Sequence, residues 1–243
     1  FYWGLSQSKM LGENCMKIHG PVFDRFGFIL EHSARLRSGA KILHIGCTTA
    51  PNTEVRWATN TLLHKALCDQ GAQLQHEIVG IDIDESAVQW LRGKMPGKRI
   101  IVGDAHRLAT VLPHECFDFI IAGDVIEHLP NPGLFLEACK SVLVDNGEIA
   151  LTTINSFGVV RFFKALFNHE AVHADHVAYY SMNTLKRLGE INGLRVLSAG
   201  YSLFERQLSK GGINGFLSCF IERGICMIFP QYAEGVVSIF KVD

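Results

Sequence analysis

The sequence lacks several features that mark particular classes of protein. Its seven cysteines are scattered and no two form a CxxC pair, so we expect neither a disulfide framework nor a zinc ribbon, and a reducing compartment fits better. No apolar run approaches the roughly 18 residues of a membrane-spanning helix. A net charge of -1 argues against nucleic acid or an anionic membrane as partner. We therefore expect a cytoplasmic protein. Because the sequence begins with Phe1 rather than Met, residues or a signal before it are left open.

What the chain does contain is a regular alternation of strand-like and helix-like segments. Its 243 residues, 48% of them hydrophobic, suffice for one α/β domain with a sizeable core. The expected strands are 41–45, 77–83, 99–102, 117–122, 148–154, 194–199 and 234–242. The expected helices are 21–36, 54–70, 85–92, 134–143 and 182–191. This alternation predicts a doubly wound, Rossmann-like sheet with helices on both faces, preceded by an N-terminal helical segment at 1–39.

The stretch 117–155 is the centre of this pattern. It holds a short apolar strand, a helix that ends at Asp145-Asn146-Gly147, and a second strand. Strand, crossover helix and strand in one unit require parallel strands buried on both faces. Ligands of such sheets bind beyond the carboxyl ends of the strands. Chemistry is therefore expected at Gly123, Asp124 and Glu127-His128, which follow the first strand of this unit.

Three further strand ends carry small or acidic residues in turn. Gly46-Cys47-Thr48 follows the first strand, where a small-residue turn lets backbone approach a ligand and aim free N–H groups at it. Asp82 follows the second strand and could accept two hydrogen bonds from a ribose. Asp104, after the third strand, could accept from the exocyclic amine of adenine. Singly these are ordinary turn residues, but three in succession favour a nucleoside site. A dinucleotide dehydrogenase is less favoured because GxGxxG does not occur here.

Over roughly residues 40–202 the chain resembles the class I S-adenosylmethionine-dependent methyltransferases. The matching pieces are KILHIGCTTA, IVGIDIDESAV, IIVGDAHRL, FDFIIAGDVIEHLPNP and GEIALTTIN. The resemblance implies a seven-stranded sheet, mostly parallel with an antiparallel last strand, and S-adenosylmethionine as cofactor with S-adenosylhomocysteine as product. It places the methionine part at Gly46 and Cys47, the ribose at Asp82, the adenine at Asp104 and Ala105, and the reacting methyl near Gly123 and Asp124. The full cofactor-binding set is Gly46, Cys47, Thr48, Asp82, Ile83, Asp104, Ala105, Gly123 and Asp124.

The first loop departs from that family. Its usual pattern is D-x-G-x-G-x-G, whereas His44, Gly46, Thr48 and Ala50 occupy those positions here. The loop GCTTAP is similar to that of a bacterial subgroup associated with glycan biosynthesis. Either the cofactor binds more weakly, or the loop is rebuilt around Pro51.

Transfer from a sulfonium needs alignment of nucleophile, methyl and sulfur, and a hydroxyl nucleophile also benefits from a base. The candidates are His128, His173 and His176, with His176 preferred as base or substrate contact, and each has a structural role as its alternative. His173 and His176, with Asp175 near, are two close histidines without a third ligand, so no metal site is expected.

The expected activity is transfer of a methyl group to a hydroxyl oxygen of a small molecule or glycan. A non-catalytic scaffold and an N-methyltransferase are the alternatives. The core is expected over 40–202, with a substrate-side insertion at 155–181, a helical insertion or lid at 203–233, and the final strand at 234–243. The apolar clusters of 203–233 indicate core or a homodimer surface, or a lid over an apolar or lipid-linked acceptor.

Overall fold

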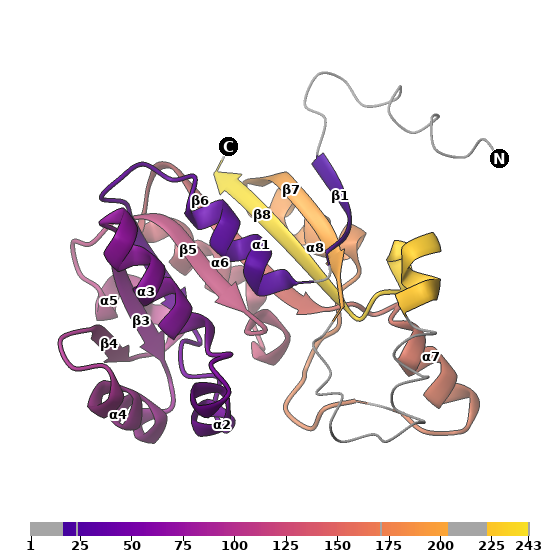
Figure 1. Ribbon diagram of the computed structural model, residues 1–243. Coiled ribbons are helices and arrows are strands. Elements are labelled where there is room, and N and C mark those ends of the chain that lie inside the picture. Colours follow the sequence, from indigo (N-terminus) through magenta and orange to yellow (C-terminus); the bar gives the residue numbers. More distant parts are fainter. Residues whose placement is uncertain (1–16, 23, 171, 204–222, 243) are drawn as a thin grey trace.

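The structure is a computed structural model that describes residues 17–22, 24–170, 172–203 and 223–242. One sheet forms its centre, with the strand order β1-β7-β8-β6-β5-β2-β3-β4 (Figure 1). Its strands are β1 (Lys17–Val22), β2 (Lys41–Ile45), β3 (Glu77–Asp82), β4 (Arg99–Val102), β5 (Phe117–Gly123), β6 (Leu143–Ile154), β7 (Leu194–Ser202) and β8 (Gly235–Val242). The helices are α1 (Arg25–Ser33), α2 (Thr53–Ala58), α3 (Leu63–Leu74), α4 (Glu85–Lys94), α5 (Leu108–Val111), α6 (Pro132–Ser141), α7 (Val159–Leu166) and α8 (Met182–Ile191), with 3-10 turns η1 (Ala105–Arg107), η2 (Ile126–His128) and η4 (Pro230–Tyr232).

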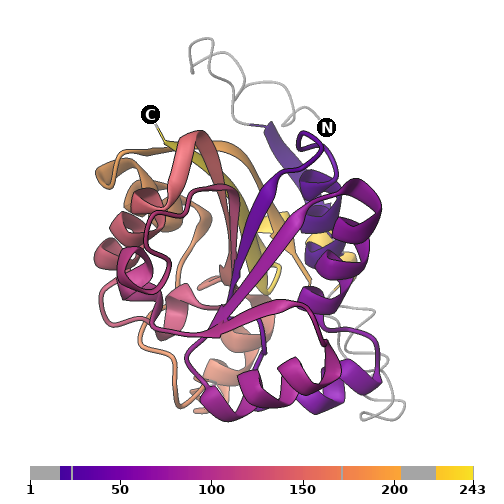
Figure 2. The ribbon, with the colours of Figure 1, turned by 90° about the vertical axis from the view of Figure 1, so that its left-hand side faces the viewer.

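The sheet is covered by helices on both faces, as Figure 2 shows edge-on. Ile29 of α1, Leu67 of α3 and Leu91 of α4 belong to one buried cluster. Phe135 of α6 and Leu185 of α8 belong to the other. Side chains of a strand point alternately to the two faces, so strands covered on both sides need an almost continuous apolar sequence. The expected doubly wound architecture is confirmed.

The direction of the strands also agrees with the expected fold. The pairs of β2 with β3 and β5, of β3 with β4, and of β5 with β6 are parallel. β8 runs antiparallel to both β6 and β7. The mostly parallel sheet with an antiparallel last strand is therefore confirmed, and the structure adds β1, which pairs parallel with β7 at the edge.

Four expected elements differ from the structure. The helix expected to end at Asp145-Asn146-Gly147 is α6, which ends at Ser141, and these three residues lie in β6. The expectation of one helix over 21–36 is wrong at its start, because Pro21 and Val22 lie in β1 and α1 begins after Asp24. The Asp24 side chain accepts a hydrogen bond from the Phe26 N–H and so caps that helix. The segment 1–39 is therefore not wholly helical, and its residues 1–16 lie outside the described ranges. The single helix expected over 54–70 is two helices, separated around Asn60, whose φ is 56°.

The chain between β7 and β8 is described only at its two ends. Residues 204–222 of the expected helical insertion lie outside the described ranges, and 223–228 are helical. Within the part of the chain that the structure describes, no helix has the length and apolar character needed to cross a bilayer.

Candidate functional site

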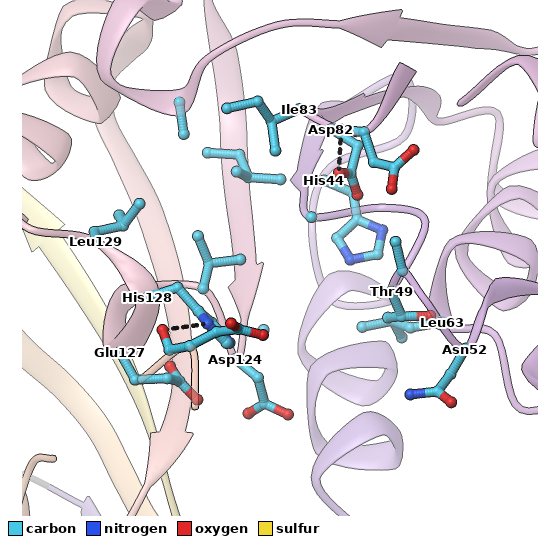
Figure 3. A pocket seen from close by; sticks show the side chains of 18 of the residues that line it. His44, Thr49, Asn52, Leu63, Asp82, Ile83, Asp124, Glu127, His128 and Leu129 are labelled. Atoms are coloured by element: carbon cyan, nitrogen blue, oxygen red, sulfur yellow. Dashed lines mark hydrogen bonds between the residues drawn. The ribbon is translucent and has the colours of Figure 1, made fainter. Parts of the chain in front are cut away.

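A cavity of about 540 Å³ lies at the carboxyl ends of the central parallel strands. Its walls include residues from the ends of β2, β3, β4 and β5 and from the segment that precedes α8. Figure 3 shows two groups of side chains across the cavity: His44, Thr49, Asn52 and Asp82 on one side, and Asp124, Glu127 and His128 on the other. We call the first group, together with Gly46 and Asp104, the β2–β4 wall. We call the second group, together with His173 and His176 of the segment before α8, the β5 wall.

The β2–β4 wall begins at the turn after β2. Gly46 has φ +73°, and a Cβ there would lie 2.7 Å from a Val125 methyl carbon, so this position requires glycine. The N–H groups of Gly46 and Cys47 donate to the Ile81 carbonyl at 2.9 and 3.3 Å. The Thr48 N–H donates to Asp82. The expectation that this turn aims free N–H groups at a ligand is therefore wrong for these three residues.

Asp82 holds this loop and also faces the cavity. One of its oxygens accepts from the Thr48 N–H at 2.9 Å and from the Thr48 hydroxyl at 2.6 Å. The other accepts from the Asp84 N–H at 3.1 Å. A carboxylate has about four acceptor positions, so three are occupied within the protein. Asp82 therefore keeps room for about one hydrogen bond from a ligand rather than the two expected.

Asp104 is fixed by its own turn at the end of β4. Its Oδ1 accepts from the His106 N–H at 2.9 Å and lies 3.0 Å from His106 Nδ1. These hydrogen bonds, led by the one from the backbone, lower the pKa of the Asp104 carboxyl. The carboxylate is thus kept ionised and able to accept from a ligand amine.

A pair of histidines lies beneath the same wall. His44 replaces the family's acidic residue, and its Nδ1 is 3.2 Å from Nδ1 of His64. Burial, with the charge of His64, lowers the pKa of His44 well below its usual value. Burial, with Lys98, lowers the pKa of His64 to about 4. Both rings are therefore neutral near pH 7, and one donates to the other.

On the β5 wall, Asp124 is held in a left-handed conformation with φ 54°. Its carboxylate accepts from Arg25 Nη1 at 2.5 Å and from the Thr152 hydroxyl at 3.0 Å. Arg25 comes from the first turn of α1, far away in the sequence. This helix therefore brings a cation to the cavity wall.

Glu127, in η2, is fully buried. Its Oε2 accepts from the Thr153 hydroxyl at 2.9 Å, whereas its Oε1 has no hydrogen-bond partner among the described residues. Burial, reinforced by the charge of Asp124, raises the pKa of Glu127 far above its usual range. Glu127 is thus a buried carboxyl group at the cavity wall whose protonated form is favoured by its surroundings.

The three histidines expected to be catalytic meet in space. The ring of His176 lies 4.5 Å from that of His128 and 4.8 Å from that of His173, centroid to centroid. His128 and His173 are exposed, and His176 is half-buried. Burial, with the charges of His128 and His173, lowers the pKa of His176 to about 4. His176 is consequently neutral near pH 7 but a weak base.

Donor atoms of Glu127, His128 and His176 all lie within 4.8 Å of one another. This set could hold a metal ion. Of the residues considered for a metal in the sequence, only His176 belongs to this set, and its two partners are Glu127 and His128.

Most of the expected site residues lie on the cavity wall. These are Gly46, Asp82, Ile83, Asp104, Ala105, Gly123, Asp124, His128, His173 and His176. Cys47 and Thr48 are fully buried and do not line it. Sequence reasoning missed Arg25, and it named Glu127 only as part of Glu127-His128, without assigning a role to its carboxyl group. The apolar residues around Glu127, in VIEHLP, are the signal that could have marked its burial.

Comparison with known proteins decides the family. A family model described as "Methyltransferase domain" matches residues 23–199. The chain belongs to this methyltransferase family. The match includes every expected site residue, from Gly46 to His176, together with the α1 helix that carries Arg25.

This methyltransferase-family chain is also similar to individual curated proteins and to solved structures. Ubiquinone biosynthesis O-methyltransferases from Bradyrhizobium diazoefficiens and Idiomarina loihiensis are 27% and 28% identical to it over 120 and 134 residues. These regions cover 48% and 54% of this chain, and 41% and 49% of those proteins. The chain thus spans at most about half the length of these curated relatives.

Solved structures show the same fold. A SAM-dependent methyltransferase from Archaeoglobus fulgidus aligns with a TM-score of 0.59 at 18% identity, covering 89% of this chain and 92% of that one. The magnesium protoporphyrin IX methyltransferase of Synechocystis, solved with bound SAH, aligns with a TM-score of 0.54 at 11% identity, covering 90% and 82%.

Proposed function

We propose that this chain is an S-adenosylmethionine-dependent methyltransferase that transfers the methyl group to a hydroxyl oxygen of a small-molecule acceptor. The observation that carries the proposal is one cavity with Asp82 and Asp104 on one wall and a cluster of histidines on the other. Family membership and the named O-methyltransferase relatives support it.

The β2–β4 wall binds the cofactor in this proposal. Asp82 accepts a ribose hydroxyl, and Asp104 accepts the adenine amine. Because the N–H groups of the first loop are used within the protein, the carboxylate of the methionine part needs another partner. Arg25 and Arg56 line the cavity and lie against the same Phe26 ring, at 4.9 and 6.0 Å from its centroid. A guanidinium group binds a carboxylate strongly, so these two arginines are the proposed partners.

The β5 wall receives the acceptor. The acceptor oxygen attacks the methyl carbon as the bond from carbon to sulfur breaks, so the protein chiefly has to align the three atoms. The hydroxyl proton leaves toward the cluster of His128, His173 and His176. The weakly basic His176 serves as a contact that orients the acceptor, rather than as the strongest base of the cluster.

A non-catalytic scaffold is the second candidate, motivated by the altered first loop. A scaffold would be supported by a loop that fills the cleft. Gly46, Thr49 and Ala50 instead line a cavity of about 540 Å³, which favours a bound cofactor.

The test is calorimetric titration of the protein with S-adenosylmethionine and S-adenosylhomocysteine, with NAD as the negative control. We expect micromolar binding of the first two and none of NAD. Asp82→Ala should abolish most of this binding, whereas Asp145→Ala, an exposed carboxylate away from the cavity, should not. Lack of binding by the unaltered protein would contradict the proposal and favour the scaffold.

The acceptor is found by screening phenols, catechols and sugars with labelled cofactor and counting methylated product. A sugar acceptor would point to glycan methylation. Methylation of amines only, surviving replacement of His128, His173 and His176, would favour an N-methyltransferase instead.

A further inference from the structure

Glu127, His128 and His176 are brought together by two segments distant in sequence. The Glu127 carbonyl oxygen accepts hydrogen bonds from the N–H groups of Val177 and Ala178, at 2.8 and 3.2 Å. These bonds hold the segment before α8 against η2. The rings of His128 and His176 lie beside this contact, with their centroids 4.5 Å apart.

Two buried polar atoms of this group lack a hydrogen-bond partner among the described residues. They are Oε1 of Glu127, a fully buried side chain, and Nδ1 of His176. A buried polar atom without a partner is costly, and most such atoms in proteins are paired. Both atoms therefore indicate a ligand that binds between them.

The third member is oriented as a ligand as well. His128 Nδ1 lies 3.1 Å from the Asp175 carbonyl oxygen. A carbonyl oxygen can only accept, so Nδ1 carries the hydrogen and Nε2 offers a lone pair. Metal-binding histidines typically donate their other N–H to a carbonyl or carboxylate in this way. The hydrogen bond from Thr153 to Glu127 Oε2 orients the carboxylate similarly.

We propose that Glu127, His128 and His176 form a binding site for a divalent transition-metal ion. Their donor atoms lie within 4.8 Å of one another. Two imidazole nitrogens and one carboxylate oxygen suit zinc and its first-row neighbours rather than calcium or magnesium. Three protein ligands leave a coordination position open, as in catalytic zinc sites. Charged groups that flank the site include Asp124 with its partner Arg25, and Asp175 beside His176.

The role of the ion rests on the proposed function. In the open position it would bind the acceptor hydroxyl and lower its pKa, as a metal does for bound water. The O–H proton is released to a neighbouring base such as His173 or to solvent. The oxygen then forms a bond to the methyl carbon, while the bond from carbon to sulfur breaks and its electron pair stays on sulfur. The products are the methyl ether and S-adenosylhomocysteine.

The test is titration of chelator-treated full chain with zinc chloride in a calorimeter, without S-adenosylmethionine. We expect one ion per chain with micromolar or tighter affinity. Glu127→Gln and His128→Ala should each weaken binding about 100-fold, since each removes a ligand. His169→Ala, an exposed histidine outside the group, should bind as the unaltered protein does. Cobalt chloride should give the visible absorption of a four-coordinate site, lost in Glu127→Gln.

Circular dichroism checks the fold of each variant, and His128→Ala at an exposed position keeps the test valid if Glu127→Gln does not fold. Absence of stoichiometric binding, or equal affinity in all variants, would overturn the metal site. A separate titration with S-adenosylmethionine distinguishes this failure from that of the proposed function: retained cofactor binding without zinc binding overturns the metal site alone.

Discussion

The two walls of the cavity use their polar groups differently. On the β2–β4 wall, Asp82 and Asp104 accept hydrogen bonds from Thr48, Asp84 and His106. On the β5 wall, Glu127 and His176 each keep a buried atom without a partner among the described residues. The carboxylates of the first wall are held by the protein and leave a few acceptor positions for a ligand, and there only Nε2 of His106, behind Asp104, is buried without a partner among the described residues. The second wall is incomplete without a ligand. A ligand that binds either wall of the folded chain should raise its stability by linkage. On the second wall the ligand would in addition give the buried atoms of Glu127 and His176 their missing partners.

The largest expected effect comes from replacing Gly46, in the loop of the β2–β4 wall. In Gly46→Ala the new Cβ would lie 2.7 Å from a Val125 methyl carbon at φ +73°. We expect a loss of about 3 kcal/mol in the free energy of unfolding and loss of cofactor binding. Gly97→Ala is the control, with φ +81° but nothing within 4 Å, and should cost about 1 kcal/mol. Urea unfolding and calorimetry measure both, and equal losses would contradict the close packing of the loop.

The second prediction concerns the neutral histidines beneath the same wall. The pKa of His64 is about 4 when folded and 6.5 when unfolded. The unfolded chain therefore binds the proton first, and stability falls as the pH drops from 6.5 toward 4. Between pH 7 and pH 5 this loss is about 2 kcal/mol.

Urea unfolding at the two pH values checks this prediction. His64→Gln should be less stable at pH 7 but lose about 2 kcal/mol less on acidification. His169→Gln, an exposed histidine, should retain the original pH dependence. A pH dependence unchanged by His64→Gln would show that this pair is not the acid-sensitive element.

A smaller effect is expected where Thr48 holds Asp82. Thr48→Val keeps the shape and removes only the hydroxyl that donates at 2.6 Å to the carboxylate. A hydrogen bond to a charged group is worth about 1.5–3 kcal/mol, so we expect a loss near the lower end and about tenfold weaker cofactor binding. Calorimetry on this variant and on Thr59→Val, an exposed threonine, tests whether Asp82 is oriented for a ligand.

The smallest expected effect comes from substitutions in the helix caps that lie next to the two walls. Ser181 and Thr184 form a capping box at the start of α8, next to the β5 wall. Asp84 caps α4 beside Asp82 and accepts from the Ala87 N–H. Ser181→Ala should cost about 1 kcal/mol, and Asp84→Ala should also lower the free energy of unfolding. Only Asp84→Ala should weaken cofactor binding, and a comparable effect of Ser181→Ala would mean that the walls are coupled.

Most of the sheet could be predicted from the sequence because each central strand is a short apolar segment that can be recognised without its neighbours. β5 is an apolar run with a turn after it, and its burial on both faces follows from that run. β1 could not be predicted, since it forms by pairing with β7, which lies far along the chain. The break between α2 and α3 occurs at Asn60, which is in a left-handed conformation. It could not be predicted because the apolar residues keep helical spacing on both sides of Asn60.

The candidate site could also be predicted in part. Strand ends indicated Asp82, Asp104 and Asp124 because a parallel sheet collects them at one edge. Arg25 was missed because its place depends on how α1 packs on the sheet. The unpartnered atoms of Glu127 and His176 could not be predicted, because their burial and their lack of a partner arise only in the folded chain.

The position of β8 has a consequence for how the chain is made. This strand pairs with β6 on one side and β7 on the other, yet the ribosome makes it after both. Until β8 emerges, β6 and β7 each present an unpaired edge, and such edges invite pairing with other chains. The part of the sheet from β6 to β4 can therefore form before β8 is made, whereas β7 and β1 can join it only through β8.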